Sequence, residues 1–267
     1  MTERVAIVTG AAAGIGWATA RKLASSGHRV ALVDLDSRLA EVRAAELGPT
    51  HLGLGCDVGQ EAEGSVTVQR VLERMGRIDV LVNNAGIGDP AGPTVEQSLA
   101  AFDRVLRVHL HGTFLMSRAA APSMLAQGSG AIVNLCSIAA LAGIPSRNAY
   151  GAAKAGIAAM TRSMACEWAR GGLRVNAIAP GYVRTALVDD LIAKGALDAH
   201  AIERRTPMGR MARPEEIAEA IAFLASAAAS FVTGAVLTAD GGWSAFGAPE
   251  AALETWCEGQ VIGTRPV

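Results

Sequence analysis

Short apolar runs alternate along this chain with longer stretches of helical periodicity. The seven apolar runs span residues 5–8, 29–33, 51–55, 80–82, 132–135, 174–178 and 236–238. The helical stretches lie near residues 15–26, 37–47, 60–75, 96–126, 148–170 and 214–227. Strand-helix-strand alternation predicts a parallel sheet with helices on both faces, because parallel neighbours need a crossover connection. We therefore expect a single doubly wound α/β domain whose ligands bind beyond the carboxyl ends of its seven strands.

Composition restricts the partners of this chain. Lysine and arginine number 24 against 25 aspartates and glutamates, so the chain offers no electrostatic footprint for nucleic acid or an anionic membrane. No apolar run approaches the ~18 residues of a membrane helix, and the first residues lack the pattern of an export signal. The cysteines show no Cys-x-x-Cys spacing, which argues against a disulfide framework and a metal site. These cysteines are Cys56, Cys136, Cys166 and Cys257. We expect a cytoplasmic protein whose partners are small molecules or other subunits.

Two segments interrupt the alternation. Residues 186–212 form a polar, partly helical insertion, and residues 246–267 follow the last predicted strand with Gly, Pro and a lone Trp256. Long excursions from compact domains are often functional, so the insertion is expected to be a lid over the site, with a plain surface helix as the alternative. We expect a catalytic domain over residues 1–245, followed by a tail that either packs on a neighbouring subunit or frays.

A glycine-rich turn follows the first predicted strand. It reads Thr9-Gly10-Ala-Ala-Ala-Gly14-Ile15-Gly16, and a predicted helix begins within it. Without Cβ atoms the backbone can approach a pyrophosphate, and exposed N–H groups with the helix N-terminus stabilise its charge. The spacing differs from the commoner Gly-x-Gly-x-x-Gly, and in a chain with 30 glycines it could be a plain turn.

Asp34 supports the interpretation as a phosphate loop, because it ends the second predicted strand about 20 residues further on, as in Rossmann-like dinucleotide sites. Its carboxylate can accept hydrogen bonds from the adenosine ribose and would repel a 2′-phosphate. Ala13 and Leu35 stand where a basic residue could neutralise that phosphate. The sequence therefore favours NAD over NADP, the alternative being that Asp34 only caps the next helix.

Further motifs follow in order along the chain. They are Asp57-Val58, Asn83-Asn84-Ala85-Gly86, Ser137, Tyr150-Gly-Ala-Ala-Lys154, Pro180-Gly181 and Asp240-Gly-Gly242. Together with the glycine-rich turn, this set resembles the short-chain dehydrogenase/reductase superfamily over nearly the whole chain, from Thr9 to about Trp243. The resemblance implies a hydride-transferring enzyme that acts on CH–OH groups.

Tyr150 and Lys154 lie four residues apart on a predicted helix, so both side chains project from one face. A nearby ammonium favours a phenolate, which can take a proton from an alcohol or return it to a ketone. The resemblance implies that Lys154 also holds the nicotinamide ribose and that Ser137 polarises the substrate oxygen. The alternatives are a solvated Tyr/Lys face and a serine that caps a helix.

His109 departs from the family pattern, because many members carry Asn at this position. There the main-chain carbonyl of the Asn helps to hold a water that links the lysine to solvent, and a histidine could keep that carbonyl. We therefore retain His109 as a fourth catalytic candidate, against the alternative of a polar residue at a helix irregularity. His111 is expected to be structural and Cys136 to belong to the core.

The resemblance assigns the remaining motif residues to the cofactor. It places Asp57 and Val58 beside adenine, Asn84, Ala85 and Gly86 near the adenosine ribose, Pro180 and Gly181 in a turn, and Val183 and Thr185 around the carboxamide and phosphates. The Asn83–Gly86 run could instead stitch strands together through side-chain hydrogen bonds.

These patterns predict an NAD-dependent oxidoreductase for a secondary alcohol or ketone, with a polyol, sugar or simple alcohol favoured. The first alternative is a 3-ketoacyl-thioester reductase, and the second is a catalytically silent dinucleotide-binding scaffold. By resemblance, the helical stretches 96–126 and 148–170 are expected to build a homotetramer.

Overall fold

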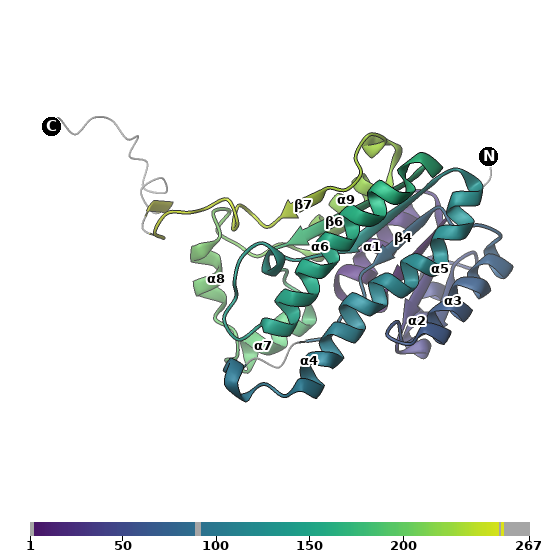
Figure 1. Ribbon diagram of the computed structural model, residues 1–267. Coiled ribbons are helices and arrows are strands. Elements are labelled where there is room, and N and C mark those ends of the chain that lie inside the picture. The colour runs from purple at the N-terminus through teal and green to yellow at the C-terminus, as the bar shows by residue number, and fades with distance from the viewer. Residues whose placement is uncertain (1–2, 89–91, 251, 254–267) are drawn as a thin grey trace.

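Seven strands form one parallel sheet in the order β3-β2-β1-β4-β5-β6-β7 (Figure 1). The strands are β1 (Arg4–Thr9), β2 (His28–Asp34), β3 (Leu52–Gly55), β4 (Val80–Asn83), β5 (Gly130–Leu135), β6 (Leu173–Pro180) and β7 (Val236–Ala239). This computed structural model describes residues 3–88, 92–250 and 252–253. All neighbouring strands pair in parallel, which confirms the predicted doubly wound sheet.

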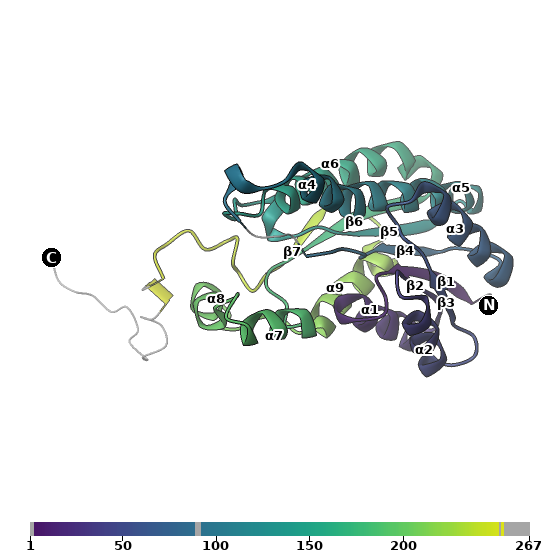
Figure 2. The same ribbon diagram turned by 90° about the horizontal axis from the view of Figure 1, so that it is seen from below.

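Helices cover both faces of the sheet. Figure 2 shows α3 (Glu61–Met75), α4 (Leu99–Leu106), α5 (Gly112–Gln127) and α6 (Asn148–Trp168) on one side. The other side carries α1 (Gly14–Ser25), α2 (Ser37–Leu47) and α9 (Pro214–Ala225), with α7 (Ala186–Ala193) and α8 (Ala199–Arg205) beyond them. Among the described residues, no helix is long and apolar enough to cross a membrane.

The central strands of the sheet are buried on both faces, which explains why they are apolar at successive positions. Ile7 and Leu81 pack into a core with Met116 of α5, whereas Val8 packs with Ile217 of α9 in a second core on the opposite face. All of these side chains are almost fully buried. Hydrophobic burial on both faces thus fixes the sheet and directs the polar residues to its ends.

The stretch predicted as one helix over residues 96–126 is interrupted. A short 3-10 turn (Thr94–Glu96) precedes α4, and a π-helical turn (Arg107–His111) separates α4 from α5. A π-turn inserts an extra residue into the helical register and is common at functional sites. His109 lies within this turn, as its alternative interpretation, a polar residue at a helix irregularity, predicts.

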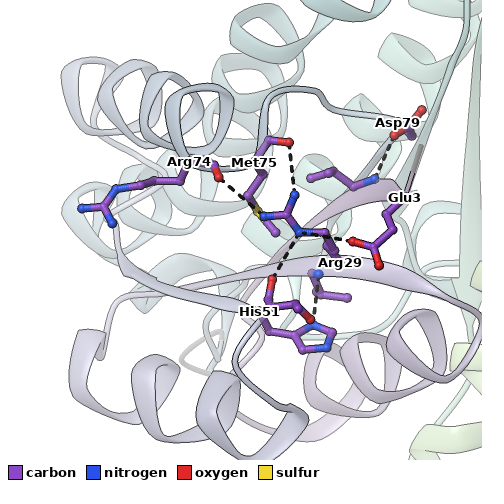
Figure 3. A network of polar contacts seen from close by, with 9 residues as sticks. Glu3, Arg29, His51, Arg74, Met75 and Asp79 are labelled. Carbon is purple, nitrogen blue, oxygen red and sulfur yellow. Dashed lines mark hydrogen bonds and ion pairs between the residues drawn. The ribbon is translucent and has the colours of Figure 1, made fainter. Parts of the chain in front are cut away.

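Arg29 secures the amino end of the sheet, opposite the predicted site (Figure 3). Its guanidinium donates at 3.5 Å to the carbonyls of Arg74 and Met75 at the C-terminus of α3. Its Nε also lies 3.9 Å from the Glu3 carboxylate. These contacts satisfy carbonyls that the helix leaves unpaired, so Arg29 attaches the C-terminus of α3 to the amino end of β2.

Candidate active site

The predicted site lies at the carboxyl ends of β1 and β4, where the strand order reverses. These strands are neighbours, yet the chain leaves them toward opposite edges of the sheet. Asn84 bridges the gap, since its Nδ2 donates to the carbonyls of Thr9 at 2.9 Å and Gly10 at 3.0 Å. Such a switch point is where open α/β sheets bind ligands.

The glycine-rich turn needs its glycines for steric reasons. Gly10 has a φ of +62°, and a Cβ there would lie 2.8 Å from the Ala85 Cα. A Cβ on Gly16 would lie 1.9 Å from the Gly10 carbonyl oxygen. Helix α1 begins at Gly14, so its first amides and Ile15 follow the turn directly. A backbone surface free of Cβ atoms at a helix N-terminus fits a pyrophosphate.

Asp34 meets this turn from the end of β2. Its Oδ2 accepts a hydrogen bond of 2.9 Å from the Ala12 amide, and its Oδ1 accepts one of 3.2 Å from the Asp36 amide. The cap of α2 belongs to Asp36, whose Oδ1 accepts from the Leu39 amide at 2.9 Å. Asp34 is therefore not the cap of α2, which excludes its alternative role. The neighbouring Leu35 is exposed.

A cation that the sequence did not reveal lies against the same turn. Arg43 of α2 donates from Nε to the Ala12 carbonyl at 3.2 Å. Its guanidinium also lies 4.9 Å from the Trp17 ring centroid. Arg43 is nine positions beyond Asp34, and only the packing of α2 beside α1 shows that the two residues approach the same alanine.

The Asn83–Gly86 run stitches strands together, as its alternative interpretation predicted. The Thr9 hydroxyl accepts hydrogen bonds of 3.0 Å from the amides of both Asn84 and Ala85. The side-chain Nδ2 of Asn83 donates at 2.9 Å to the side-chain oxygen of Asn134 in β5. Gly86 leaves room for a neighbouring ring, because a Cβ there would lie 2.4 Å from Cε1 of His109. The run thus joins β1, β4 and β5 at the edge where a ribose is expected.

Asp57 and Val58 follow β3 at the same edge. The Asp57 carboxylate accepts a hydrogen bond of 2.9 Å from the Gly59 amide. The backbone amide of Asp57 donates to the Glu63 carboxylate at 2.7 Å. Val58 is buried beside Gly112, where a Cβ would lie 2.7 Å from the valine Cγ2. Local hydrogen bonding and packing therefore fix both residues.

The segment after β6 turns back toward the glycine-rich turn. Pro180 ends β6, and the Gly181 amide donates to the Ala239 carbonyl of β7 at 3.2 Å. Val183 is buried. Thr185 caps α7 and lies next to Gly14, since a Cβ on that glycine would meet the threonine Cγ2 at 3.4 Å. The fold thus joins two motifs that are about 170 residues apart in the chain.

Tyr150 and Lys154 share one face of α6, as their spacing predicts. The Lys154 Nζ lies 5.4 Å from the Tyr150 ring centroid and donates to the Leu135 carbonyl at 2.6 Å. The lysine side chain is buried, and this burial lowers the pKa of Lys154 to about 8, although the Cys136 thiol acts in the opposite direction. An ammonium is thus held beside a phenol at the carboxyl end of β5.

Ser137 directly follows β5 and is 8% exposed. Its hydroxyl accepts a hydrogen bond of 3.2 Å from the Ala139 amide, so it caps the short 3-10 turn Ile138–Ala140. A capping hydroxyl is fixed in place but keeps its proton available for donation. The preceding Cys136 is buried, which confirms its place in the core, and burial raises the pKa of its thiol.

His109 lies buried between the Tyr150 ring and the segment after β4. Its ring packs edge-on against Tyr150 with 5.3 Å between centroids. The His109 Nε2 lies 3.1 Å from the Ile87 amide nitrogen and 3.0 Å from the Ile87 carbonyl oxygen. The main-chain carbonyl of His109 accepts from the Thr113 hydroxyl at 2.7 Å. Burial, and after it the charge of Lys154, lower the pKa of His109 to about 3, so the imidazole is neutral.

Two cavities border segments that follow the strands. One of about 490 Å³ is lined by Thr206 and Met208 of the 186–212 insertion and by Tyr182 and Gly242, among others. Another of about 420 Å³ adjoins Ile87 and α4. The described residues contain no cluster of three or more His, Cys, Asp or Glu side chains that could hold a metal ion. His111 is exposed on the π-turn.

Comparison with known proteins agrees with this geometry. The model of a family described as enoyl-(acyl carrier protein) reductase matches residues 10–244. An uncharacterized short-chain type dehydrogenase/reductase of Sinorhizobium fredii is 48% identical over 93% of this chain. This chain spans only 45% of the length of that relative. The cis-4-hydroxycyclohexanecarboxylate dehydrogenase of Sinomonas cyclohexanicum is 48% identical over 91% of this chain and 97% of its own length.

A solved structure shares the architecture. The 3-ketoacyl-(acyl-carrier-protein) reductase from Brucella melitensis complexed with NADH has a TM-score of 0.84 and 34% sequence identity, covering 90% of this chain and 98% of that one. The family model, the relatives and the sheet topology confirm the resemblance that the motifs indicated. The chain therefore belongs to the short-chain dehydrogenase/reductase superfamily and is an oxidoreductase built on a dinucleotide-binding sheet.

Proposed function

We propose that the protein transfers a hydride between NAD(H) and a secondary alcohol or its ketone, using Tyr150, Lys154 and Ser137. The observation that carries this proposal is the buried Lys154 Nζ, 5.4 Å from the Tyr150 ring centroid. A cation at that position stabilises a deprotonated phenol. Ser137 follows the neighbouring strand β5, so all three side chains belong to the edge of the sheet that carries the glycine-rich turn.

Each residue has a distinct part in the reaction. The bound dinucleotide supplies the hydride acceptor at its nicotinamide ring. Ser137 orients the substrate hydroxyl by a hydrogen bond, and Tyr150 accepts the hydroxyl proton during oxidation or donates it during reduction. Lys154 stabilises the phenolate and passes the proton onward. His109 holds the Ile87 segment and the Tyr150 ring in place, since its side chain contacts both.

The cofactor is proposed to be NAD. Asp34 is oriented by two backbone amides, which leaves its carboxylate able to accept the adenosine ribose hydroxyls. We place the pyrophosphate over Gly10, Gly14, Ile15 and Gly16, the adenine between Leu35 and Asp57-Val58, and the adenosine ribose near Asn84, Ala85 and Gly86. Pro180, Gly181, Val183 and Thr185 are placed around the carboxamide. Comparing initial rates with NADH and NADPH tests the choice, and faster turnover with NADPH would contradict it.

The substrate is proposed to be a polyol, a sugar or a simple secondary alcohol, enclosed by the insertion 186–212 as a lid. The Sinomonas relative is named for a ring compound with a secondary hydroxyl. The thioester alternative has support as well, because the Brucella neighbour is named as a ketoacyl carrier-protein reductase and binds NADH. A rate panel of polyols, cyclic alcohols and acetoacetyl thioesters separates the two.

We further propose a homotetramer in the cytoplasm, with a catalytic domain over residues 1–245. The exposed faces of α5 and α6, which include Phe114, would supply one subunit contact. The tail 246–267 lies largely outside the described residues. Light scattering of the purified protein tests the assembly, and a monomer in dilute solution would contradict it.

Replacement of Tyr150 by Phe tests the mechanism. Y150F removes the proton acceptor but keeps the ring that packs on His109, so NADH binding measured by fluorescence is expected to persist. Turnover is expected to fall by about 10²–10⁴-fold, as for loss of a general acid–base group. Tyr182, the second of the two tyrosines, lines the cavity formed with the 186–212 insertion, so Y182F is expected to change KM rather than to lower turnover by this factor.

Undiminished turnover by Y150F would remove Tyr150 from the mechanism. If the wild-type protein binds NADH but oxidises none of the alcohols in the panel and reduces none of the ketones or thioesters, the silent scaffold becomes the better description.

A further inference from the structure

Ala12 of the glycine-rich turn separates two opposite charges. On one side, the Asp34 Oδ2 accepts from the Ala12 amide at 2.9 Å. On the other, the Arg43 Nε donates to the Ala12 carbonyl at 3.2 Å. A guanidinium is therefore held one residue away from the carboxylate that is proposed to bind the adenosine ribose. No basic residue is encoded at Ala13 or Leu35, so this cation reaches the turn only through the packing of α2.

Arg43 is pre-organised at this position. Its guanidinium stacks 4.9 Å from the Trp17 ring centroid, and its Nη1 lies 3.0 Å from both carboxylate oxygens of Glu46. The Arg43 side chain is 31% exposed and that of Glu46 is 45% exposed. Solvent-exposed ion pairs of this kind are weak, so Glu46 can yield to a stronger anion. A stacked guanidinium loses little freedom on binding, and its fork of N–H groups suits a phosphate.

We propose that Arg43 is the cation of a latent 2′-phosphate subsite, which Asp34 alone keeps closed. The proposal rests on the dinucleotide site proposed above. If Asp34 holds the adenosine ribose hydroxyls, a phosphate on the 2′-oxygen would project beside the Ala12 backbone. The Asp34 carboxylate repels that phosphate in the native protein. Without the carboxylate, the phosphate is free to accept hydrogen bonds from Arg43.

The test measures binding of two adenosine probes by calorimetry, which needs neither substrate nor turnover. The probes are 5′-AMP and adenosine 2′,5′-bisphosphate, which differ only in the 2′-phosphate. The wild-type protein is expected to prefer 5′-AMP. The D34S variant is expected to gain about tenfold in affinity for the bisphosphate, because repulsion is removed and a charge-assisted contact is added. This gain should shrink as salt is raised.

Double variants assign the gain to a residue. D34S/R43M is expected to lose it and D34S/R43K to keep part of it. The affinity of both double variants for 5′-AMP is expected to stay within about twofold of that of D34S. D34S/R38M is the matched control, because Arg38 is an exposed arginine on the same helix and nearer in sequence to Asp34. That variant should keep the full gain.

Some results would overturn the subsite alone. They are a bisphosphate gain that survives R43M, a gain that disappears with R38M instead, or no gain in a D34S protein that still binds 5′-AMP. Failure of the wild-type protein to bind either NADH or 5′-AMP would instead overturn the proposed cofactor site, and the subsite with it. Weaker 5′-AMP binding by the single R43M variant would also overturn the subsite, because Arg43 would then contribute to the ordinary adenosine site instead of a latent one.

Discussion

At the scale of single residues, His109 carries an unusual hydrogen-bonding arrangement. One nitrogen, Nε2, faces both the amide and the carbonyl of Ile87, but a neutral imidazole nitrogen either donates or accepts. Its Nδ1 is buried and has no hydrogen-bond partner among the described residues. A side-chain amide carries a donor and an acceptor and could serve both Ile87 groups. The histidine therefore satisfies either the amide or the carbonyl of Ile87 but not both, and a buried polar group without a hydrogen bond lowers the stability of the fold.

The same burial makes the protein sensitive to acid through His109. The pKa of His109 is lowered from 6.5 to about 3, so between these values the unfolded chain binds a proton that the folded protein does not. Stability from this group is fully present above pH 6.5 and is lost as the pH falls toward 3. The free energy of unfolding should therefore fall by about 1.4 kcal/mol per pH unit below 6.5 from this residue.

The H109N variant tests this dependence. Its free energy of unfolding, measured by urea denaturation, should fall less steeply between pH 6.5 and 5 than that of the wild-type protein. H111N is the control, because His111 is exposed two residues away and its replacement should keep the wild-type slope. Equal slopes in wild type and H109N would show that this histidine does not govern acid sensitivity.

Residues whose roles depend on local spacing could be predicted from the sequence. Tyr150 and Lys154 lie on one helical face because they are four positions apart, and Asp34 ends the strand that follows helix α1. Arg43 could not be predicted, because its contact with Ala12 depends on how two helices pack. The imidazole contacts of His109 depend in the same way on the backbone of the segment after β4.

At the scale of elements, hydrophobic periodicity located the strands but missed a change of register. The predicted helix 96–126 is divided by the π-turn Arg107–His111. Hydrophobic periodicity does not reveal this division, because apolar residues before and after the π-turn still recur at helical spacing. The extra residue of the π-turn becomes visible only in the backbone hydrogen bonds. The β1–α1 turn behaves differently, since its geometry follows from glycines that the sequence displays.

Replacement of Gly16 by Ala tests how tightly that turn is constrained. The new Cβ would lie 1.9 Å from the Gly10 carbonyl oxygen, which is backbone and cannot rotate away. We expect G16A to lower the free energy of unfolding by about 1–3 kcal/mol, the range for overpacking, and to weaken NADH binding. G143A is the control, because a Cβ at Gly143 would meet nothing within 4 Å. Unchanged NADH affinity in a folded G16A protein would contradict a phosphate-binding role for the turn.

At the scale of the whole molecule, the sheet was predictable and the attachment of its excursions was not. The parallel sheet follows from strand-helix alternation, whereas the contacts of the 186–212 insertion depend on long-range packing. Arg205 of α8 donates to the carbonyls of Trp243 at 3.3 Å and Phe246 at 2.9 Å. Its guanidinium also lies 5.0 and 4.9 Å from the two ring centroids. Arg205 therefore links the insertion to the segment after β7, beside a backbone hydrogen bond of 3.1 Å from the Met208 amide to the Gly241 carbonyl.

Removal of this side chain should loosen both segments without disturbing the sheet. In R205A the two rings and carbonyls lose their shared partner, so amide hydrogen exchange is expected to rise in residues 199–212 and 240–246 but not in β1 or β5. R204A is the comparison variant, because the neighbouring Arg204 side chain is 46% exposed and its contact with Glu250 is long, at 3.7 Å. If the insertion is a lid, R205A should raise KM for the alcohol more than it changes NADH affinity, because the loosened lid encloses the substrate. Faster exchange confined to the insertion would show instead that the two segments move independently.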